Sequence, residues 1–315
     1  MKRKIPFFSD LYEKYRKKFY EKFNRELDYG LISRAHEKYT NSIIKTPAKF
    51  LHFEKTDNPK ISVIIPVYNQ FELTMKCLES ILQSTKAKNY EIILIDDHST
   101  DETRKIEEYV KNIKVIRNEK NAGFLKNCNS GAKAAKGEYL YLLNNDTQLL
   151  ENAMEKLAEI LDKVKDCGAA GSKLIFPDGK LQGAGSIIKK DGSTASIGIF
   201  KNPLAPEFNE LKEVNYCCGA SLMVRKALWD NLGGFDTLFS PGYYEETDLC
   251  LRIKEIGCKT IYQPESEVIH FCGCSFKEST ERLIKQNRKK FLKKWRGRLK
   301  SKIKPVQADS RAGFC

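Results

Sequence analysis

The sequence contains no long hydrophobic run. No segment approaches the roughly eighteen consecutive apolar residues that a membrane-spanning helix needs. The first residues, Met1–Pro6, lead into charged side chains rather than into the apolar core of a signal peptide. We therefore expect a globular protein located in the cytoplasm. Its 315 residues, 41% of them hydrophobic, can bury a sizeable core in one large α/β domain or in two smaller ones.

The cysteines form neither a disulfide framework nor a zinc motif. None of the ten belongs to a C-x-x-C pair, and they occur within apolar strand-like segments or singly in predicted helices. A set of reduced thiols fits this distribution. His270, Cys272 and Cys274 occupy alternate positions, but no fourth ligand stands at the usual spacing, so we do not expect zinc there.

Glycine-rich phosphate-binding loops are absent as well. The sequence contains neither G-x-G-x-x-G nor G-x-x-x-x-G-K, and the first predicted strand leads instead into Pro66-Val-Tyr-Asn69. A dinucleotide-binding domain of the Rossmann type is therefore disfavoured. If the protein binds a nucleotide, its phosphates would have to be held by a metal ion rather than by a glycine-rich loop.

The net charge of +14 is concentrated near the two ends of the chain. Residues 1–60 carry +7 and residues 277–304 carry +11, which leaves −4 for residues 61–276. This distribution argues against a nucleic-acid partner and for terminal segments that meet something anionic. Residues 1–57 predict a basic helix that packs on the main domain or on a second copy in a homo-oligomer, because aromatic residues recur at three- and four-residue spacing at Phe7, Phe8, Tyr12, Tyr15, Phe19, Tyr20 and Phe23.

Strands and helices alternate four times from Ile61 onward. We expect strands at 61–69, 90–95, 113–117 and from 139, separated by helices that include 71–84 and a segment ending at 136. Short connections favour a largely parallel sheet with right-handed crossovers. Further along, we expect a helix at 151–165, a helix from about 244, strands at 259–263 and 267–271, and a basic helix from 279 to 298.

Polar residues follow each of the first four strands. In open α/β sheets ligands bind beyond the carboxyl ends of the strands, so these residues predict a nucleotide or metal site. The alternative is a set of ordinary turns, since Asn and Asp are common there. Ser99 or Thr100 is expected to cap the helix after the second strand. The polar strand ends are Tyr68 and Asn69, Asp96 and Asp97, Asn118 and Asn121, and Asn144 to Asp146.

A group of acids opens the helix that begins near Tyr244. Glu245, Glu246 and Asp248 fall in its first turn, where carboxylates also suit the helix dipole. Leu249, Arg252 and Ile253 are expected to face the core. Capping and catalysis are both open interpretations of these acids.

The motifs, taken in order, resemble family 2 glycosyltransferases with the GT-A fold, over about residues 60–295. The resemblance is greatest to the branch that builds bacterial O-antigen and capsule glycans, including rhamnosyltransferase-like members. The motifs are Ile61-Ser-Val-Ile-Ile-Pro-Val-Tyr-Asn69, Asp96-Asp-His-Ser-Thr-Asp101, Asn121-Ala-Gly-Phe124 with Asn129-Ser-Gly131, Leu143-Asn-Asn-Asp-Thr147, Gly233-Gly-Phe-Asp236, Tyr244-Glu-Glu-Thr-Asp-Leu-Cys-Leu-Arg252 and the late His270.

The resemblance implies an α/β fold: a Rossmann-like, mostly parallel sheet in an αβα sandwich, with helical N- and C-terminal extensions. It implies a glycosyltransferase domain at 58–276, whose nucleotide-sugar half is 58–150 and whose acceptor half is 151–276. The flanking parts would be a basic helical extension at 1–57, a basic helix at 277–304 and a tail at 305–315.

The resemblance also implies site residues. Asp97 would contact the nucleobase, and Asn144-Asn145-Asp146 takes the place of the family's D-x-D motif, with an amide where the first carboxylate stands. Asp146 and His270 would hold Mn²⁺ or Mg²⁺, although His270 also suits a buried strand end. The expected nucleotide-sugar residues are Pro66, Tyr68, Asn69, Asp97, Ser99, Asn121, Gly123, Asn129, Asn144 and Asn145, and the expected acceptor residues are Gly219, Ala220 and Tyr244.

The implied activity is an inverting, metal-dependent transfer from a UDP- or dTDP-sugar to a glycan or lipid-linked glycan. Glu246 would be the base, with Glu245 as the neighbouring candidate. A catalytically weak domain that only binds nucleotide-sugar or glycan is the alternative. The helix near Leu283–Trp295 is expected either to dock on the anionic inner face of the cell membrane through its apolar edge and lysines, or to pack on the core.

Overall fold

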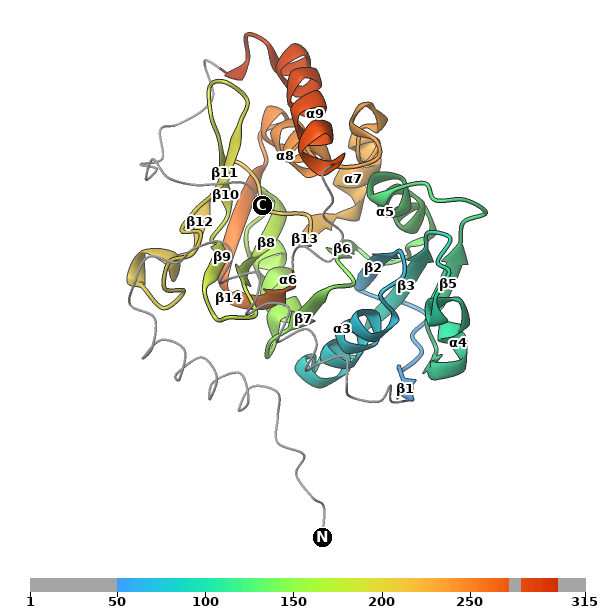
Figure 1. Cartoon of the computed structure of the whole chain (residues 1–315). Helices are drawn as coiled ribbons and strands as arrows, with labels where there is room; N and C mark the ends of the chain where they lie inside the picture. The colour runs from blue at the N-terminus through green and yellow to red at the C-terminus, as the bar shows by residue number, and fades with distance from the viewer. Residues whose placement is uncertain (1–49, 272–278, 300–315) are drawn as a thin grey trace.

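One large mixed sheet forms the centre of the molecule, with helices on both of its faces (Figure 1). The computed structural model describes residues 50–271 and 279–299. Within these residues the ten strands of this sheet pair in the order β12 (Lys212–Glu213), β14 (Lys259–His270), β8 (Cys167–Ile175), β13 (Ser221–Arg225), β6 (Tyr139–Leu143), β2 (Ile61–Val67), β3 (Tyr90–Asp96) and β5 (Lys114–Arg117), with β7 (Thr147–Leu149) beside β14 and β9 (Leu181–Gly183) beside β8.

The strands β6, β2, β3 and β5 run parallel to one another. Every residue of β2 and β6 is buried, as expected for parallel strands that helices cover on both sides. The predicted alternation of strands and helices is therefore confirmed in this half, and the helix predicted at 71–84 has those bounds. The helical segments between these strands are α3 (Phe71–Ser84), η1 (Glu102–Lys105) with α4 (Ile106–Tyr109), and α5 (Phe124–Ala134).

The other half of the sheet is mixed. Strand β13 is antiparallel to both β6 and β8, whereas β14 is parallel to β8. The prediction of two separate strands at 259–263 and 267–271 is wrong, because β14 is a single strand whose register shifts between Gln263 and Glu267. Pro264 lies within this irregularity, and its missing N–H leaves it unable to donate to a neighbouring strand.

Shorter elements complete the fold. The hairpin of β10 (Ser186–Ile188) and β11 (Thr194–Ser196) stands apart from the main sheet, as does the pair of β1 (Leu51–His52) and β4 (Val110–Lys111). The remaining helices are α6 (Ala153–Lys163), η2 (Pro206–Phe208), α7 (Lys226–Leu232), η3 (Thr237–Phe239), α8 (Glu245–Glu255) and α9 (Ser279–Trp295).

The alternation of side chains along the strands divides the core into two layers. Val63 and Ile65 of β2 pack with Leu78 of α3 and Leu157 of α6 on one face. Ile64, between them, points to the opposite face, where α5, α7, α8 and α9 pack. The structure is thus the predicted αβα sandwich with a mostly parallel central sheet.

Helix α9 packs on the core. Phe291 and Trp295 are buried against the layer that contains α8, and the ring centroids of Phe291 and Tyr244 lie 5.1 Å apart. Of the two alternatives given for this helix, packing on the core is therefore the one that holds for Phe291 and Trp295, and these two side chains are not available to enter a membrane. Leu249 and Ile253 of α8 are buried as predicted.

No helix among the described residues is long and apolar enough to cross a bilayer. The aromatic stripe predicted within residues 1–57 and the tail at 305–315 lie outside the described residues. The division of the transferase domain at residue 150 stays a prediction.

Candidate active site

Asp97 organises the loop beyond β3. Its Oδ1 accepts hydrogen bonds from the Ala122 N–H at 2.7 Å and the Asn118 side chain at 2.8 Å, and its Oδ2 accepts one from the Gly123 N–H at 2.9 Å. The Asn121 side chain donates to the Asp97 carbonyl at 3.5 Å. A carboxylate offers roughly four acceptor sites, so the three protein contacts leave Asp97 about one for a ligand.

The ends of β2 and β3 are joined by side chains that were predicted to bind the nucleotide. The Asn69 N–H donates to Ser99 Oγ at 2.8 Å, and Asn69 Oδ1 accepts from the Thr100 N–H at 2.7 Å. Tyr68 is 53% exposed beside them, whereas Pro66 is buried within β2. Of these residues, Tyr68 is the one that offers a ring to a ligand.

The predicted helix cap after β3 is wrong. Ser99 accepts from the loop of β2, and neither it nor Thr100 caps η1. Asp101 caps η1 instead, because its Oδ1 accepts from the Thr103 N–H at 3.0 Å.

The start of α5 approaches the second half of the chain closely. Gly123 has a φ of 86°, and a Cβ placed on it would lie 2.6 Å from Pro241 Cβ, so glycine is required there. Both amide atoms of Asn129 bond to the backbone of Phe235, each at 2.9 Å. Asn129 therefore joins α5 to the backbone that follows the Gly233-Gly234 turn. The resemblance implied that Asn129 would bind the nucleotide-sugar, but both polar atoms of its amide are already bonded to Phe235.

Asp146 and His270 meet where β6 ends beside the end of β14. Asp146 Oδ1 lies 3.3 Å from His270 Nε2, and Asn144 Nδ2 lies 3.3 Å from the same nitrogen. On the other side of the ring, His270 Nδ1 lies 2.8 Å from Gln182 Oε1 of β9. A proton on Nδ1 bonded to Gln182 leaves the Nε2 lone pair turned toward Asp146, as in histidines that bind metals.

These side chains suit a divalent cation. Burial acts to raise the pKa of Asp146, but the positive charge that His270 carries when protonated, together with hydrogen bonds from His270, the backbone and Asn144, holds this pKa below its ordinary value. Asn144 Oδ1 is buried without a partner within the described part of the chain, and it can serve as an oxygen ligand. Among the described residues, no three His, Cys, Asp or Glu side chains are arranged to hold a metal ion, so a cation at this place would need further ligands, such as oxygen atoms of a substrate or water.

Asn145 faces away from this group. Its side chain donates to Thr74 Oγ1 of α3 at 3.0 Å. Asn145 therefore fixes the turn between β6 and β7, and the structure does not bring it together with Asp146 and His270.

Glu245 and Glu246 open α8. Burial raises the pKa of Glu246 to about 7. Burial and the Glu246 charge raise the pKa of Glu245 well above its ordinary value. Glu245 is 4% exposed, whereas Glu246 is partly exposed, and one carboxylate oxygen of each lacks a partner among the described residues. Glu246 is the better placed of the two to meet a substrate.

Gly219 and Ala220 connect Glu246 to the end of β6. A Cβ placed on Gly219 would lie 3.8 Å from Glu246 Cβ and 3.7 Å from the ring of Phe124. The next residue, Ala220, accepts a hydrogen bond from the Asn144 N–H at 3.0 Å. The candidate base, the start of α5 and the end of β6 thus converge on residues 219–220.

Tyr244, predicted to bind the acceptor, has a structural contact instead. Its hydroxyl donates to the Gly192 carbonyl at 2.9 Å, and its side chain is 5% exposed. Burial raises the pKa of Tyr244 to about 12. Tyr244 therefore holds the start of α8 against the β10–β11 hairpin.

Two residues with contacts to the site, Gln182 and Asn287, were not predicted from the sequence. Gln182 lies in a three-residue strand without a motif, and only the fold brings it to His270. Asn287 lies four residues before Phe291 and eight before Trp295, a spacing that places all three on one face of α9. That spacing was a usable signal.

Comparison with known proteins identifies the family. The family model described as Glycosyl transferase family 2 matches residues 62–232, more than half of the chain. The O-antigen biosynthesis protein RfbC of Myxococcus xanthus is 27% identical over 225 residues, which are 67% of this chain and 17% of RfbC. The putative glycosyltransferase EpsE of Bacillus subtilis is 29% identical over 205 residues, which are 63% of this chain and 68% of EpsE. The chain thus spans less than a fifth of RfbC.

A solved structure supports the fold. The crystal structure of GalNAc-T7 with UDP, GalNAc and Mn²⁺ matches with a TM-score of 0.58 and 22% identity, over 69% of this chain and 44% of that one. The resemblance that the motifs indicated is thereby confirmed. The family match, the named relatives and the layered fold together show that the chain belongs to glycosyl transferase family 2 and has the GT-A fold.

Proposed function

We propose that this chain is an inverting enzyme that moves a sugar from a nucleoside-diphosphate sugar to a hydroxyl group of a growing cell-surface glycan. The observation that carries the proposal is the state of Glu246, a partly exposed residue whose carboxyl group is buried enough to raise its pKa to about 7. It lies beside Gly219, next to the polar strand ends. A general base is most effective when its pKa lies near the working pH.

In the proposed reaction, the acceptor oxygen bonds to the anomeric carbon from the face opposite the leaving group. The bond between that carbon and the nucleoside diphosphate breaks, and Glu246 takes the proton of the hydroxyl group. Burial and the charge of Glu246 raise the pKa of Glu245 well above its ordinary value, which favours the protonated form of Glu245. Only one of the two adjacent acids is then charged, which avoids the repulsion between two buried carboxylates.

We place the donor nucleotide over the ends of β2, β3 and β6. The exposed ring of Tyr68 would stack on the base, and the Asp97-bound turn at Asn121–Gly123 would face the ribose and diphosphate. GalNAc-T7 was crystallised with UDP, which makes UDP-sugars, with dTDP-sugars, the first donors to test.

Asp146 and His270, with the Asn144 amide oxygen, would hold Mn²⁺ or Mg²⁺. When bound, such an ion supplies positive charge to the leaving diphosphate. Gln182 orients His270 for this task. Because Asn144 stands where the family's motif has an acid, the site carries one negative charge fewer, and we propose weaker metal binding than a second carboxylate would give.

For the acceptor we propose a free or lipid-linked glycan, the class that the name of RfbC suggests. Lys285, Lys289 and Lys293 are exposed on α9, and Arg296 is exposed directly after it. We propose that they attract the protein to the anionic inner face of the cell membrane by charge alone, with Phe291 remaining in the core.

A second function is a domain that binds nucleotide-sugar or glycan without transfer. The observation that favours it is Asn144, which weakens the candidate metal site. One experiment separates the two. The protein is incubated with UDP-, dTDP- and GDP-sugars and Mn²⁺, with and without glycan acceptors, and nucleoside diphosphate release and thermal shift are measured. Acceptor-stimulated release supports the enzyme; a thermal shift without release supports the binding domain.

A further inference from the structure

Helix α9 holds the loop that leads into the candidate base. The Asn287 side-chain amide donates to the carbonyls of Phe239 and Gly242 at 2.8 Å and of Tyr243 at 3.1 Å. Asn287 is fully buried. One side chain thus contacts three carbonyl groups of residues 239–243, called here the 239–243 loop. Glu245 follows two residues later, and α9 itself lies beyond the residues that the family model matches.

The backbone after this loop needs such support. Tyr243 and Tyr244 have φ angles of 72° and 75°, in the left-handed region that side chains with a Cβ rarely adopt. Conformations of this kind persist when surrounding contacts hold them, and they occur often at functional sites. Here two of them in succession set the direction in which α8 starts, and with it the position of Glu246.

The oxygen atom of the Asn287 amide indicates that this side chain serves to position the loop rather than to stabilise the fold. Its Oδ1 is buried without a hydrogen-bond partner among the described residues. Turning the amide over would place this oxygen against three carbonyl oxygens, so the loop dictates its orientation. A buried unpartnered oxygen disfavours the folded state. An apolar residue would avoid that cost, but it would leave the three carbonyls unbound.

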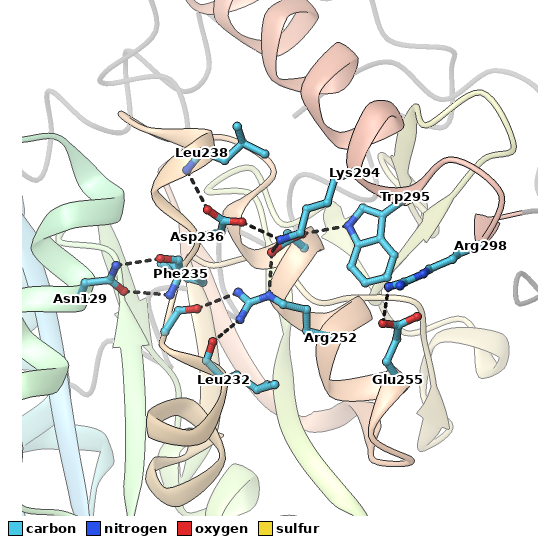
Figure 2. A network of polar contacts seen from close by, with 12 residues as sticks. Asn129, Leu232, Phe235, Asp236, Leu238, Arg252, Glu255, Lys294, Trp295 and Arg298 are labelled. Carbon is cyan, nitrogen blue, oxygen red and sulfur yellow. Dashed lines mark hydrogen bonds and ion pairs between the residues drawn. The ribbon is translucent and has the colours of Figure 1, made fainter.

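A second set of contacts joins α9 to the first turns of α8 (Figure 2). The Trp295 indole N–H donates to Asp248 Oδ1 at 2.9 Å, and Lys294 Nζ lies 2.8 Å from Asp248 Oδ2. Arg252 donates to the same carboxylate at 2.8 Å and to the carbonyls of Leu232 and Gly234. Contacts from α9 therefore hold the chain both before and after Glu246.

From these contacts we infer that Asn287 is a positioning residue for Glu246, acting through the 239–243 loop. This inference rests on the proposed function, in which Glu246 is the base. Its consequence is that α9 affects the rate at which Glu246 removes the proton of the acceptor hydroxyl group, although α9 does not contact the nucleotide-sugar.

The test is Asn287→Ala in the full chain, with Arg298→Ala as its control. Arg298, which follows the end of α9, also contacts α8, through Glu255 at 2.8 Å, but at the far end of α8. We expect Asn287→Ala to lower kcat by at least roughly tenfold while the donor KM changes by less than about twofold. The acidic limb of the pH–rate profile should move by about half a pH unit or more, because the surroundings of Glu246 change. Arg298→Ala should leave kcat and the profile unchanged.

A kcat of Asn287→Ala within twofold of the parent, or an equal loss in Arg298→Ala, would overturn the inference. Amide hydrogen exchange gives a readout that needs no activity. Exchange at residues 243–248 should accelerate by at least roughly tenfold in Asn287→Ala, with β2 and β3 unchanged. Unchanged exchange would overturn the inference as well.

If the parent transfers no sugar, the proposed function fails, and exchange alone decides whether Asn287 holds the loop. Asn287→Ser, which keeps one donor, serves if Asn287→Ala does not fold.

Discussion

The two halves of the sheet differ in how far along the chain their functional residues find their partners. In the first half, Asp97 binds groups 21 to 26 residues away, and Asn69 binds Ser99 at a separation of 30. In the second half, His270 lies 88 residues from Gln182 and 126 from Asn144. The loops beyond β2 and β3 are thus held largely by nearby sequence, whereas the candidate metal site is assembled by the whole fold.

This difference indicates where single substitutions should act most strongly. A loop held by several nearby backbone contacts can lose one of them and keep its course. A residue whose position depends on a few long-range contacts has no other contacts to hold it when one of them is lost. The predictions below test this comparison, beginning with the largest expected effect.

Glu246→Gln keeps the size and hydrogen bonding of the side chain but cannot accept a proton. We expect kcat to fall by at least roughly a hundredfold while nucleotide binding survives. Glu245→Gln, the matched control, should cost much less, since burial and the charge of Glu246 favour the protonated form of that acid. Steady-state kinetics and nucleotide titration check both variants. An active Glu246→Gln beside an inactive Glu245→Gln would show that the base is misassigned.

Asp146→Ala should abolish metal-dependent nucleotide binding, because it removes the only carboxylate of the proposed metal site. His270→Ala should weaken this binding, and Asn144→Asp should strengthen it by restoring a negative charge. Asn145→Ala is the control, since Asn145 faces Thr74. Titration of each variant with Mn²⁺ checks the order. Full activity of Asp146→Ala in EDTA would contradict a metal-assisted mechanism.

The pH dependence follows from the raised pKa of Glu246, about 7. The base works only when ionised, so kcat/KM should rise about tenfold per pH unit up to about pH 7 and then level. Stability should move the other way. A carboxyl group with a raised folded-state pKa stabilises the fold below its unfolded pKa and loses that contribution as pH rises through about 7. Glu246→Gln should flatten both curves, and a profile without an acidic limb near 7 would contradict the assignment.

The smallest effect concerns the exposed face of α9. Changing Lys285, Lys289 and Lys293 to Gln should reduce binding to anionic vesicles, where each basic residue contributes about 1 kcal/mol. Added salt should reduce it further. Catalysis on a soluble acceptor should stay unchanged, because these side chains are exposed, whereas Asn287 is buried against the 239–243 loop. Co-sedimentation with vesicles checks this, and no binding of the parent at low salt would remove the membrane proposal.

The sequence was sufficient to predict the layered fold and the polar strand ends. The bounds of α3 and the parallel order of the first strands follow from local hydrophobic patterns and short connections. Pro264 illustrates the limit: it indicates a break between two strands, yet pairing with β8 on both sides of the irregularity keeps β14 continuous. Pairing partners far along the chain decide such cases.

The sequence by itself determined which residue types stand at each strand end, because strand period, helix period and motif order are local properties. Only the tertiary structure decided what those residues do. It turned Asn129 and Tyr244 to backbone groups, oriented His270 with Gln182, and raised the pKa of Glu246 by burial. Hydrogen-bond partners and desolvation depend on what packs nearby in space, and the helix that holds the base in place begins more than thirty residues after it.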